Sequence, residues 1–153
     1  MFIWIDNDGC PRIVRDIIFK NAARCKVVVK VVGNAYAQVP LGGGVQMIKV
    51  DGGFDKADDY IAENVVAGDL VVTSDVPLAA RIVEKGAIGL SCRGEIFDKG
   101  NMSDKLSTRN LLQELRSGGT ISGGPAPFGD AEKRNFANAL DRLVSKLVGT
   151  SSR

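Results

Sequence analysis

Short runs of β-branched and other apolar residues alternate along this chain with stretches of helical periodicity. The runs end at polar residues, and their apolar character is typical of strands that are buried on both faces of a parallel sheet. They predict five strands, at residues 2–5, 27–32, 45–50, 69–74 and 87–90.

Proline and glycine mark the ends of the helices expected between these strands. Pro11 and Pro77 stand where a first helical turn begins, and Gly86 stands where the second of these helices ends. Helices are expected at residues 11–24, 55–64, 77–85, 103–116 and 130–148. Loops are expected at residues 33–44, which contain three consecutive glycines, and in the glycine-rich segment 118–129.

The alternation of strands and helices predicts the fold class. It is typical of an α/β protein with right-handed crossovers, in which helices cover both faces of a parallel sheet. We therefore expect a single three-layer α/β domain over residues 1–149, with a central, mainly parallel sheet of about five strands, and a tail at residues 150–153. Ligands of such folds bind at the carboxyl edge of the sheet.

Composition narrows the chemistry more than it narrows the fold. The chain of 153 residues is 44% apolar and 25% charged, and its formal net charge of +2 is too small to signal a nucleic-acid partner by bulk electrostatics. It contains no histidine, which excludes Ser-His-Asp catalysis and histidine-based metal sites. The three cysteines lack CxxC spacing and no apolar run is long enough for a membrane span, so we expect a cytoplasmic protein with no membrane partner.

Two aspartates follow the first expected strand, in the run Asp6-Asn7-Asp8-Gly9-Cys10-Pro11. They would lie at the carboxyl edge of the sheet, beside the start of a helix. Hard divalent cations prefer carboxylate oxygens as ligands, so Asp6 and Asp8 are candidate metal ligands. Asp8 has a second interpretation, because aspartate is also a favoured helix N-cap.

Further aspartates occupy comparable positions later in the chain. Asp75 follows the fourth expected strand, so it should approach Asp6 if the two strands are neighbours. It could equally cap the next helix. Asp55, Asp58 and Asp59 begin another helix, where the helix dipole alone would favour them. A functional site therefore depends on the convergence of several segments.

These acidic segments carry a resemblance to a known family. The sequence resembles the uncharacterised YaiI/YqxD family of bacterial proteins, whose fold is grouped with PIN and NYN-type nucleases, and the resemblance covers almost the whole chain. The matching positions are 5–11, Asn34 with Pro40, 53–58, 68–79, Arg93-Gly94, Arg109 and Gly123-Gly124-Pro125. The chain departs from the family at Asn7 and Gly9, where alanine is more common, and by added glycines at 42–44.

The resemblance implies a PIN-like domain and a metal-dependent nuclease. It implies that Asp6 matches the first metal-binding acid, Asp58 the acid before a mid-chain helix and Asp75 the acid after a later strand, with Asp8 as a fourth ligand. In those nucleases such acids hold Mg²⁺ or Mn²⁺, which activates water and stabilises charge at the scissile phosphate. The leading hypothesis is therefore a phosphodiesterase that acts on RNA, with Asp6 and Asp75 central to catalysis.

Other side chains are candidates for contacts with a substrate. Arg93 and Arg109 could hold phosphate because a guanidinium forks onto its oxygens, although exposed arginines are common. Asn34 could orient a substrate or satisfy the backbone of its own loop. A helix N-terminus would lower the pKa of the Cys10 thiol, whereas small buried cysteines are usually inert. Gly123-Gly124-Pro125 lacks the Lys-Ser/Thr of a P-loop and is expected to form a turn.

Two other classes of function stay open. The run that begins at Asp6 after an apolar strand also resembles the signature of haloacid-dehalogenase phosphatases, with Asp6 as nucleophile and Asp8 as general acid. The cap insertion and the late lysine-then-acid order of that family are not evident in this chain. A non-catalytic module that binds nucleic acid or protein is the third hypothesis, because one fold hosts many functions.

Overall fold

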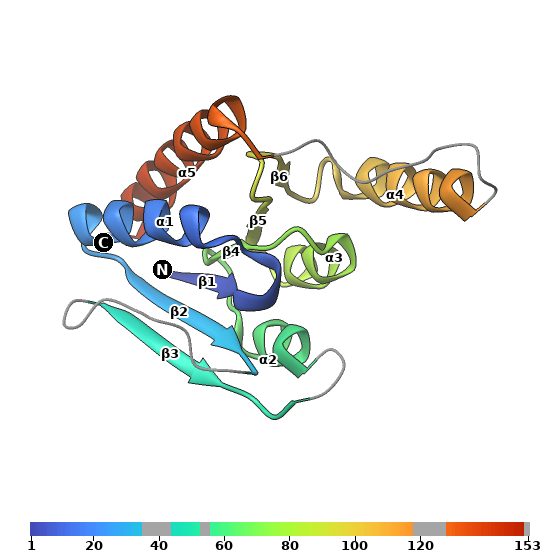
Figure 1. Cartoon of the computed structure of the whole chain (residues 1–153). Helices are drawn as coiled ribbons and strands as arrows, with labels where there is room; N and C mark the ends of the chain where they lie inside the picture. Colours follow the sequence, from blue (N-terminus) through green and yellow to red (C-terminus); the bar gives the residue numbers. More distant parts are fainter. Residues whose placement is uncertain (35–43, 53–55, 118–127, 152–153) are drawn as a thin grey trace.

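The computed structural model describes residues 1–34, 44–52, 56–117 and 128–151 (Figure 1). The elements within these residues, in chain order, are β1 (Phe2–Asp6), the 3-10 turn η1 (Asn7–Gly9), α1 (Arg12–Cys25), β2 (Val28–Gly33), β3 (Val45–Lys49), α2 (Lys56–Asn64), β4 (Leu70–Val72), α3 (Val76–Glu84), β5 (Ile88–Leu90), β6 (Ile96–Phe97), α4 (Met102–Ser117) and α5 (Asp130–Ser151). The expected fold class is confirmed, because this is an α/β architecture with helices around a mostly parallel sheet.

The six strands form one sheet in the order β3-β2-β1-β4-β5-β6. Every neighbouring pair is parallel except β5 and β6, which pair in antiparallel fashion through Gly89 with Phe97 and Leu90 with Ile96. The chain proceeds outward from β1 through β2 to β3, and then returns to the other side of β1 with β4. The boundary between β1 and β4 is therefore the topological switch point, where open α/β sheets bind their ligands.

Apolar side chains cover both faces of the sheet and give the fold its layers. Ile3 and Ile5 of β1 belong to a core cluster with residues of α1 and α5, whereas Trp4, which alternates with them, belongs to a second cluster with residues of α2 and α3. Figure 1 shows α1 and α5 on one side of the sheet and α2 and α3 on the other. Such two-sided burial explains why the strands read as continuous apolar runs.

The last helix closes one of these faces. Phe136, Leu140 and Val144 of α5 are buried in the cluster that contains α1. The turn after β5 holds α5 at close range, because a Cβ built on Gly94 would lie 2.9 Å from the backbone carbonyl carbon of Asn135. The helix continues to Ser151, beyond residue 148, where the sequence predicts its end.

Asp69 organises the opposite, amino edge of the sheet. Its side chain, in a residue only 2% exposed, accepts hydrogen bonds from the backbone N–H of Phe2 at 3.0 Å, from Nε1 of Trp4 at 3.0 Å and from the N–H of Val66 at 3.2 Å. Three donors satisfy this buried carboxylate, so its role is structural. No helix within the described ranges has the length and apolarity to cross a membrane.

Candidate functional site

The candidate site lies at the switch point between β1 and β4. Asp6 is the last residue of β1, and Thr73, Ser74 and Asp75 follow β4, which pairs with β1 in parallel. The expectation that these two strands are neighbours is therefore correct. Because parallel strands end at the same edge of a sheet, the chain brings Asp6 and Asp75 to one place from positions far apart in the sequence.

Asp6 is the centre of this arrangement. It is 7% exposed and accepts a hydrogen bond from Oγ1 of Thr73 at 3.3 Å, and the nearby side chain of Asp58 lowers its pKa. Among the described residues, no lysine or arginine forms an ion pair with Asp6. The structure therefore buries an acid among other acids.

The electrostatics of Asp6 follow from this environment. Burial raises the pKa of Asp6 above its ordinary value, and the negative charges of Asp8 and Asp75 raise it further. The hydrogen bond from Thr73 and the nearby side chain of Asp58 act in the opposite direction without cancelling the rise. The ionised carboxylate is thus disfavoured at this position, as expected for neighbouring like charges in a desolvated place.

Asp75 combines two roles that the sequence left as alternatives. Its Oδ1 accepts a hydrogen bond from the backbone N–H of Leu78 at 3.0 Å, so it is the N-cap of α3. Its own N–H donates to Oγ1 of Thr73 at 3.1 Å, which connects the cap to the residue that binds Asp6. The charge of Asp75 also acts on Asp6. The cap interpretation is therefore correct for Asp75, and the cap lies inside the acidic cluster.

Asp8 reaches the cluster in a different way. It lies exposed in the turn η1, and its charge raises the pKa of Asp6. The interpretation of Asp8 as the cap of the first helix is wrong, because Pro11 is the N-cap residue of α1 and no side chain caps it. Asp8 lies within the turn η1, which ends before α1 begins, so its side chain is held beside Asp6 instead.

The two described aspartates at the start of α2 differ in their relation to Asp6. Asp58 lies in the first turn of α2, and its side chain lowers the pKa of Asp6. Its neighbour Asp59 forms an ion pair with Nη1 of Arg81 at 2.9 Å, and Asp55 lies outside the described residues. Of the acids implied by the resemblance, Asp8, Asp58 and Asp75 each act on the pKa of Asp6, and their role as metal ligands stays a prediction.

These four acids supply the oxygen ligands that Mg²⁺ and Mn²⁺ prefer. In the part of the chain that the structure describes, no group of three or more acidic or cysteine side chains is already arranged to hold a metal ion. The donor chemistry fits such an ion, and the raised pKa of Asp6 reports negative charge that a cation would offset. The side chains of the four acids would have to rotate toward one another to coordinate the same ion.

Two cysteines lie directly under the cluster. Cys10 and Cys92 are buried; Sγ of Cys10 donates to the carbonyl oxygen of Pro11 at 3.8 Å, and Sγ of Cys92 donates to the carbonyl oxygen of Gly9 at 3.5 Å. The contact with Cys92, together with burial, raises the pKa of Cys10, whereas the contacts with Cys10 and Ser74 lower the pKa of Cys92 to about 7. Of the two interpretations of Cys10, its burial and raised pKa favour the inert thiol over one activated by a helix N-terminus.

The predicted substrate-binding residues are spread around the site. Asn34 is exposed and directly follows β2, the strand beside β1. Arg93 lies 3.7 Å from Glu132 of α5, from its Nη1 to Oε1, so it also holds the last helix in place. Arg109 belongs to α4 and lines a groove. Their roles toward a substrate stay predictions, and Gly123-Gly124-Pro125 lies outside the described residues.

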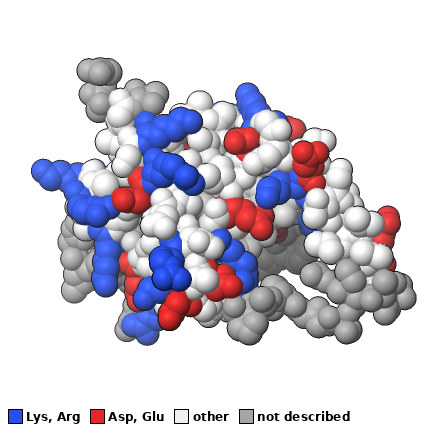
Figure 2. Space-filling view, turned by 90° about the horizontal axis from the view of Figure 1, so that it is seen from above, with Lys and Arg blue, Asp and Glu red and all other residues white. Residues whose placement is uncertain are grey.

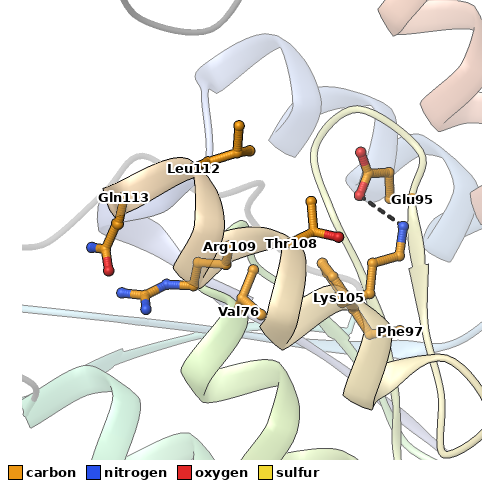
Figure 3. Close-up of a pocket in the computed structure, with 8 residues that line it drawn as sticks. All are labelled: Val76, Glu95, Phe97, Lys105, Thr108, Arg109, Leu112 and Gln113. Atoms are coloured by element: carbon orange, nitrogen blue, oxygen red, sulfur yellow. Dashed lines mark hydrogen bonds and ion pairs between the residues drawn. The ribbon is translucent and has the colours of Figure 1, made fainter. Parts of the chain in front are cut away.

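A groove of about 380 Å³ begins at Val76, the residue after Asp75 in the chain (Figure 3). Val76, which directly follows Asp75, lines the groove together with Phe97 of β6 and Glu95, the residue before β6. One face of α4 forms the opposite wall. Lys105 of α4 forms an ion pair across this groove with Glu95, with 3.1 Å between Nζ and Oε2. The volume is within the usual range of small-molecule sites.

The sequence did not identify three polar residues near Asp6 as part of the site. Thr73 and Ser74 were counted only as the end of a strand, yet Thr73 binds Asp6 and Ser74 is hydrogen-bonded to Cys92. Arg15 of α1 donates from its Nη1 to Oδ1 of Asn7 and so holds the turn that carries Asp8. The signal available was the polar run after an apolar strand, since residues there share the edge with Asp6.

Basic and acidic side chains share the part of the surface that is seen from above in Figure 2. On the face drawn in Figure 2, acidic side chains lie between the basic ones. This distribution agrees with the small formal net charge of +2. A polyanionic ligand would therefore have to be recognised by a few local cations rather than by a broad positive field.

The fold and the site together define the class of protein: a mostly parallel α/β domain with a cluster of aspartates at the switch point of its sheet. Within that class, the chain belongs to the uncharacterised BCR, YaiI/YqxD family (DUF188), whose family model matches residues 4–146.

Relatives of the same family match along nearly their whole length. The chain is 50% identical over 148 residues to a UPF0178 protein of Citrifermentans bemidjiense, which covers 97% of this chain and 96% of the relative. It is 49% identical over 148 residues to a UPF0178 protein of Maridesulfovibrio salexigens, with 97% and 98% covered. No solved structure matches significantly. The names of these relatives state no activity, so the family membership assigns no reaction.

Proposed function

We propose that this chain is a metal-dependent phosphodiesterase of the PIN-like type that cleaves RNA in the cytoplasm. The observation that carries the proposal is the convergence of Asp8, Asp58 and Asp75 on the buried carboxyl group of Asp6. These acids come from the ends of two strands and from the start of a helix. The three free cysteines are consistent with a reducing compartment.

The energetic cost of this cluster is the argument for a cation. A buried acid without a basic partner lowers the stability of a fold. A single substitution could remove its charge and raise that stability. A bound divalent cation offsets the repulsion, and in a phosphodiesterase it activates water and stabilises charge on the phosphate. Asp6 and Asp75 would hold the ion, with Asp8 and Asp58 as the further ligands.

The protein's own residues orient these ligands. Thr73 donates to Oδ2 of Asp6 at 3.3 Å, so the carboxylate has a fixed direction. Leu78 engages Oδ1 of Asp75, which leaves Oδ2 as the oxygen that can turn toward the cluster. Arg15 fixes the side chain of Asn7 in the turn that presents Asp8. Partners of this kind around metal ligands set ligand geometry and affinity.

RNA is the substrate that the surrounding side chains favour. The acids repel phosphate until a cation is bound, and the local cations Arg93 and Arg109, with the amide of Asn34, provide backbone contacts. A net charge of +2 gives little affinity for long duplexes. We therefore expect short, single-stranded segments to be cleaved in preference to duplex.

The test is cleavage of an end-labelled single-stranded RNA by the purified chain in Mn²⁺, compared with EDTA. Asp75→Asn keeps an N-cap residue and removes the charge, so it should lower the rate by about 100-fold or more with the fold intact. Asp59→Asn, whose acid pairs with Arg81, is the matched control and should cleave like the parent. Equal cleavage by Asp75→Asn and the parent would indicate a contaminating nuclease and sink the proposal.

The phosphatase hypothesis predicts a different result in the same preparation. A nucleophilic Asp6 would turn over small phosphomonoesters and would be trapped by a phosphate mimic. The cap insertion and the late lysine-then-acid order of the phosphatase family are not evident in this chain. No feature of the site therefore favours this reaction over phosphodiester cleavage.

A further inference from the structure

The residues that line this groove are more polar than those of a hydrophobic core. Five residues of α4 line it, and they recur at the spacing of a single helix face: Lys105, Thr108, Arg109, Leu112 and Gln113. A face used only for packing would be apolar at these positions. Here one residue of the five is apolar, and the other four carry hydrogen-bonding groups.

The same helix is anchored to the domain only near its beginning. Met102 is buried and Leu106 is half-buried in the cluster that contains α2 and α3. Beyond them α4 extends away from the sheet (Figure 1), and most of its described side chains are exposed. Packing among the described residues therefore does not account for the polar face along the groove.

The groove combines apolar side chains, the ion pair of Glu95 with Lys105, and the guanidinium of Arg109. Val76 and Phe97 form one wall, and Leu112, which is 37% exposed, offers an apolar surface on the other. Arg109 donates to the neutral amide oxygen of Asn110 at 3.4 Å, and no acid among the described residues forms an ion pair with it. Figure 3 shows Thr108, Arg109 and Gln113 along the helix at this groove.

The position of the groove connects it to the reaction proposed above. Val76 follows Asp75 directly, so the groove begins about 3.8 Å along the chain from an acid of the cluster. A nucleotide has an apolar base face, a hydrogen-bonding base edge and a phosphate, and the groove offers a counterpart to each. Its volume of about 380 Å³ is in the range of small-ligand sites.

We propose that this groove binds one nucleotide of a single-stranded RNA substrate, next to the phosphate that the acidic cluster cleaves; the inference rests on the proposed function. The base lies against Val76 and Leu112. Thr108 and Gln113 provide hydrogen bonds to its edge, and Arg109 holds the adjoining phosphate. The groove thus determines which nucleotide flanks the cleaved bond, whereas the acids determine the chemistry.

The test measures binding of a short, unstructured, fluorescently labelled RNA of mixed sequence to the full chain in EDTA, so that no cleavage is needed. Leu112→Ala should weaken binding by about fivefold, and Arg109→Gln by about tenfold. Leu111→Ala is the matched control, because Leu111 is the adjacent leucine, is 56% exposed and does not line the groove. It should bind like the parent.

The outcomes separate this inference from the proposed function. If Leu112→Ala and Arg109→Gln bind less RNA while Leu111→Ala does not, the groove is a nucleotide site even if no cleavage is found. If all variants bind equally, or the parent binds no RNA, the groove proposal is overturned, while Mn²⁺-dependent cleavage that needs Asp75 would stand. Circular dichroism checks that each variant is folded.

Discussion

Thr73 donates a hydrogen bond from Oγ1 to Oδ2 of Asp6 at 3.3 Å and joins the ends of the neighbouring strands β1 and β4. The same Oγ1 accepts the N–H of Asp75 at 3.1 Å. One hydroxyl therefore fixes the relative positions of two acids that come from distant parts of the chain. This link makes the acidic cluster a property of the sheet rather than of a loop.

The first prediction concerns the stability cost of Asp6. Asp6→Asn removes a buried charge and keeps an oxygen that accepts from Thr73, so the substituted chain should be more stable at neutral pH. We expect Tm to rise by about 2 to 4 °C, the response of a domain of this size to ~1 kcal/mol. Mn²⁺-dependent cleavage should be lost. A lower Tm at neutral pH would contradict the account of the cluster.

The pH dependence of this difference has a defined sign. The pKa of Asp6 is raised in the folded state, so the folded chain binds the proton more tightly than the unfolded chain. The stability that the protonated form contributes is present below the ordinary pKa of 3.8 and is lost as the pH rises through the folded value. The advantage of Asp6→Asn should therefore be largest at neutral pH and shrink on acidification, as urea unfolding at several pH values would measure.

A second prediction separates the two roles of Asp75. Asparagine caps helices about as well as aspartate, so Asp75→Asn should unfold at the same urea concentration as the parent. Asp75→Ala loses the bond to the N–H of Leu78 and should be about 1 kcal/mol less stable. Both should lose cleavage. If Asp75→Asn were as destabilised as Asp75→Ala, the charge would be part of the fold and not of the site.

A third prediction uses Asp69, the buried acid at the opposite edge. Its carboxylate accepts from Phe2, Trp4 and Val66, and Asp69→Asn sets an amide donor against one of these donors. We expect a loss of about 2 to 3 kcal/mol in the free energy of unfolding. Cleavage per folded molecule should not change, because Asp69 lies away from the cluster. Loss of cleavage in the fully folded variant would be inconsistent with this division.

A fourth prediction tests how the turn that carries Asp8 is held. A Cβ at Gly33 would lie 2.9 Å from Cβ of Asn7, whereas a Cβ at Gly9 would lie 3.5 Å from Oδ2 of Asp6. Gly33→Ala must displace the turn and should cost about 1 to 3 kcal/mol. Gly9→Ala should stay within about 0.5 kcal/mol of the parent. Equal costs in chemical denaturation would show that Asn7 does not pack as described.

The sequence predicted the parts of this structure that follow from periodicity and topology. Apolar runs located five of the strands. Because parallel strands end at one edge of a sheet, the sequence also predicted that Asp6 and Asp75 lie close together. The strand β6 was missed because Ile96–Phe97 is a two-residue run between charged residues and carries no periodicity. Its antiparallel pairing builds one wall of the groove.

The side-chain contacts across the carboxyl edge of the sheet could not be predicted from the sequence. The bond from Thr73 to Asp6 depends on the register of β4 against β1, which no local pattern specifies. The contact between Cys10 and Cys92 depends in the same way on where the turn after β5 crosses the first helix. Asp8 was open to interpretation as a cap because the turn η1 before Pro11 has no clear sequence signal.

The most direct measurement of the central claim is Mn²⁺ binding by calorimetry to the parent chain, Asp58→Asn and Asp59→Asn. These neighbouring aspartates begin the same helix, but Asp58 acts on the pKa of Asp6 whereas Asp59 pairs with Arg81. If the four acids form a cation site, Asp58→Asn should weaken Mn²⁺ binding by about tenfold or more, and Asp59→Asn should leave it unchanged. Equal binding by all three chains, or no binding by the parent, would contradict the claim.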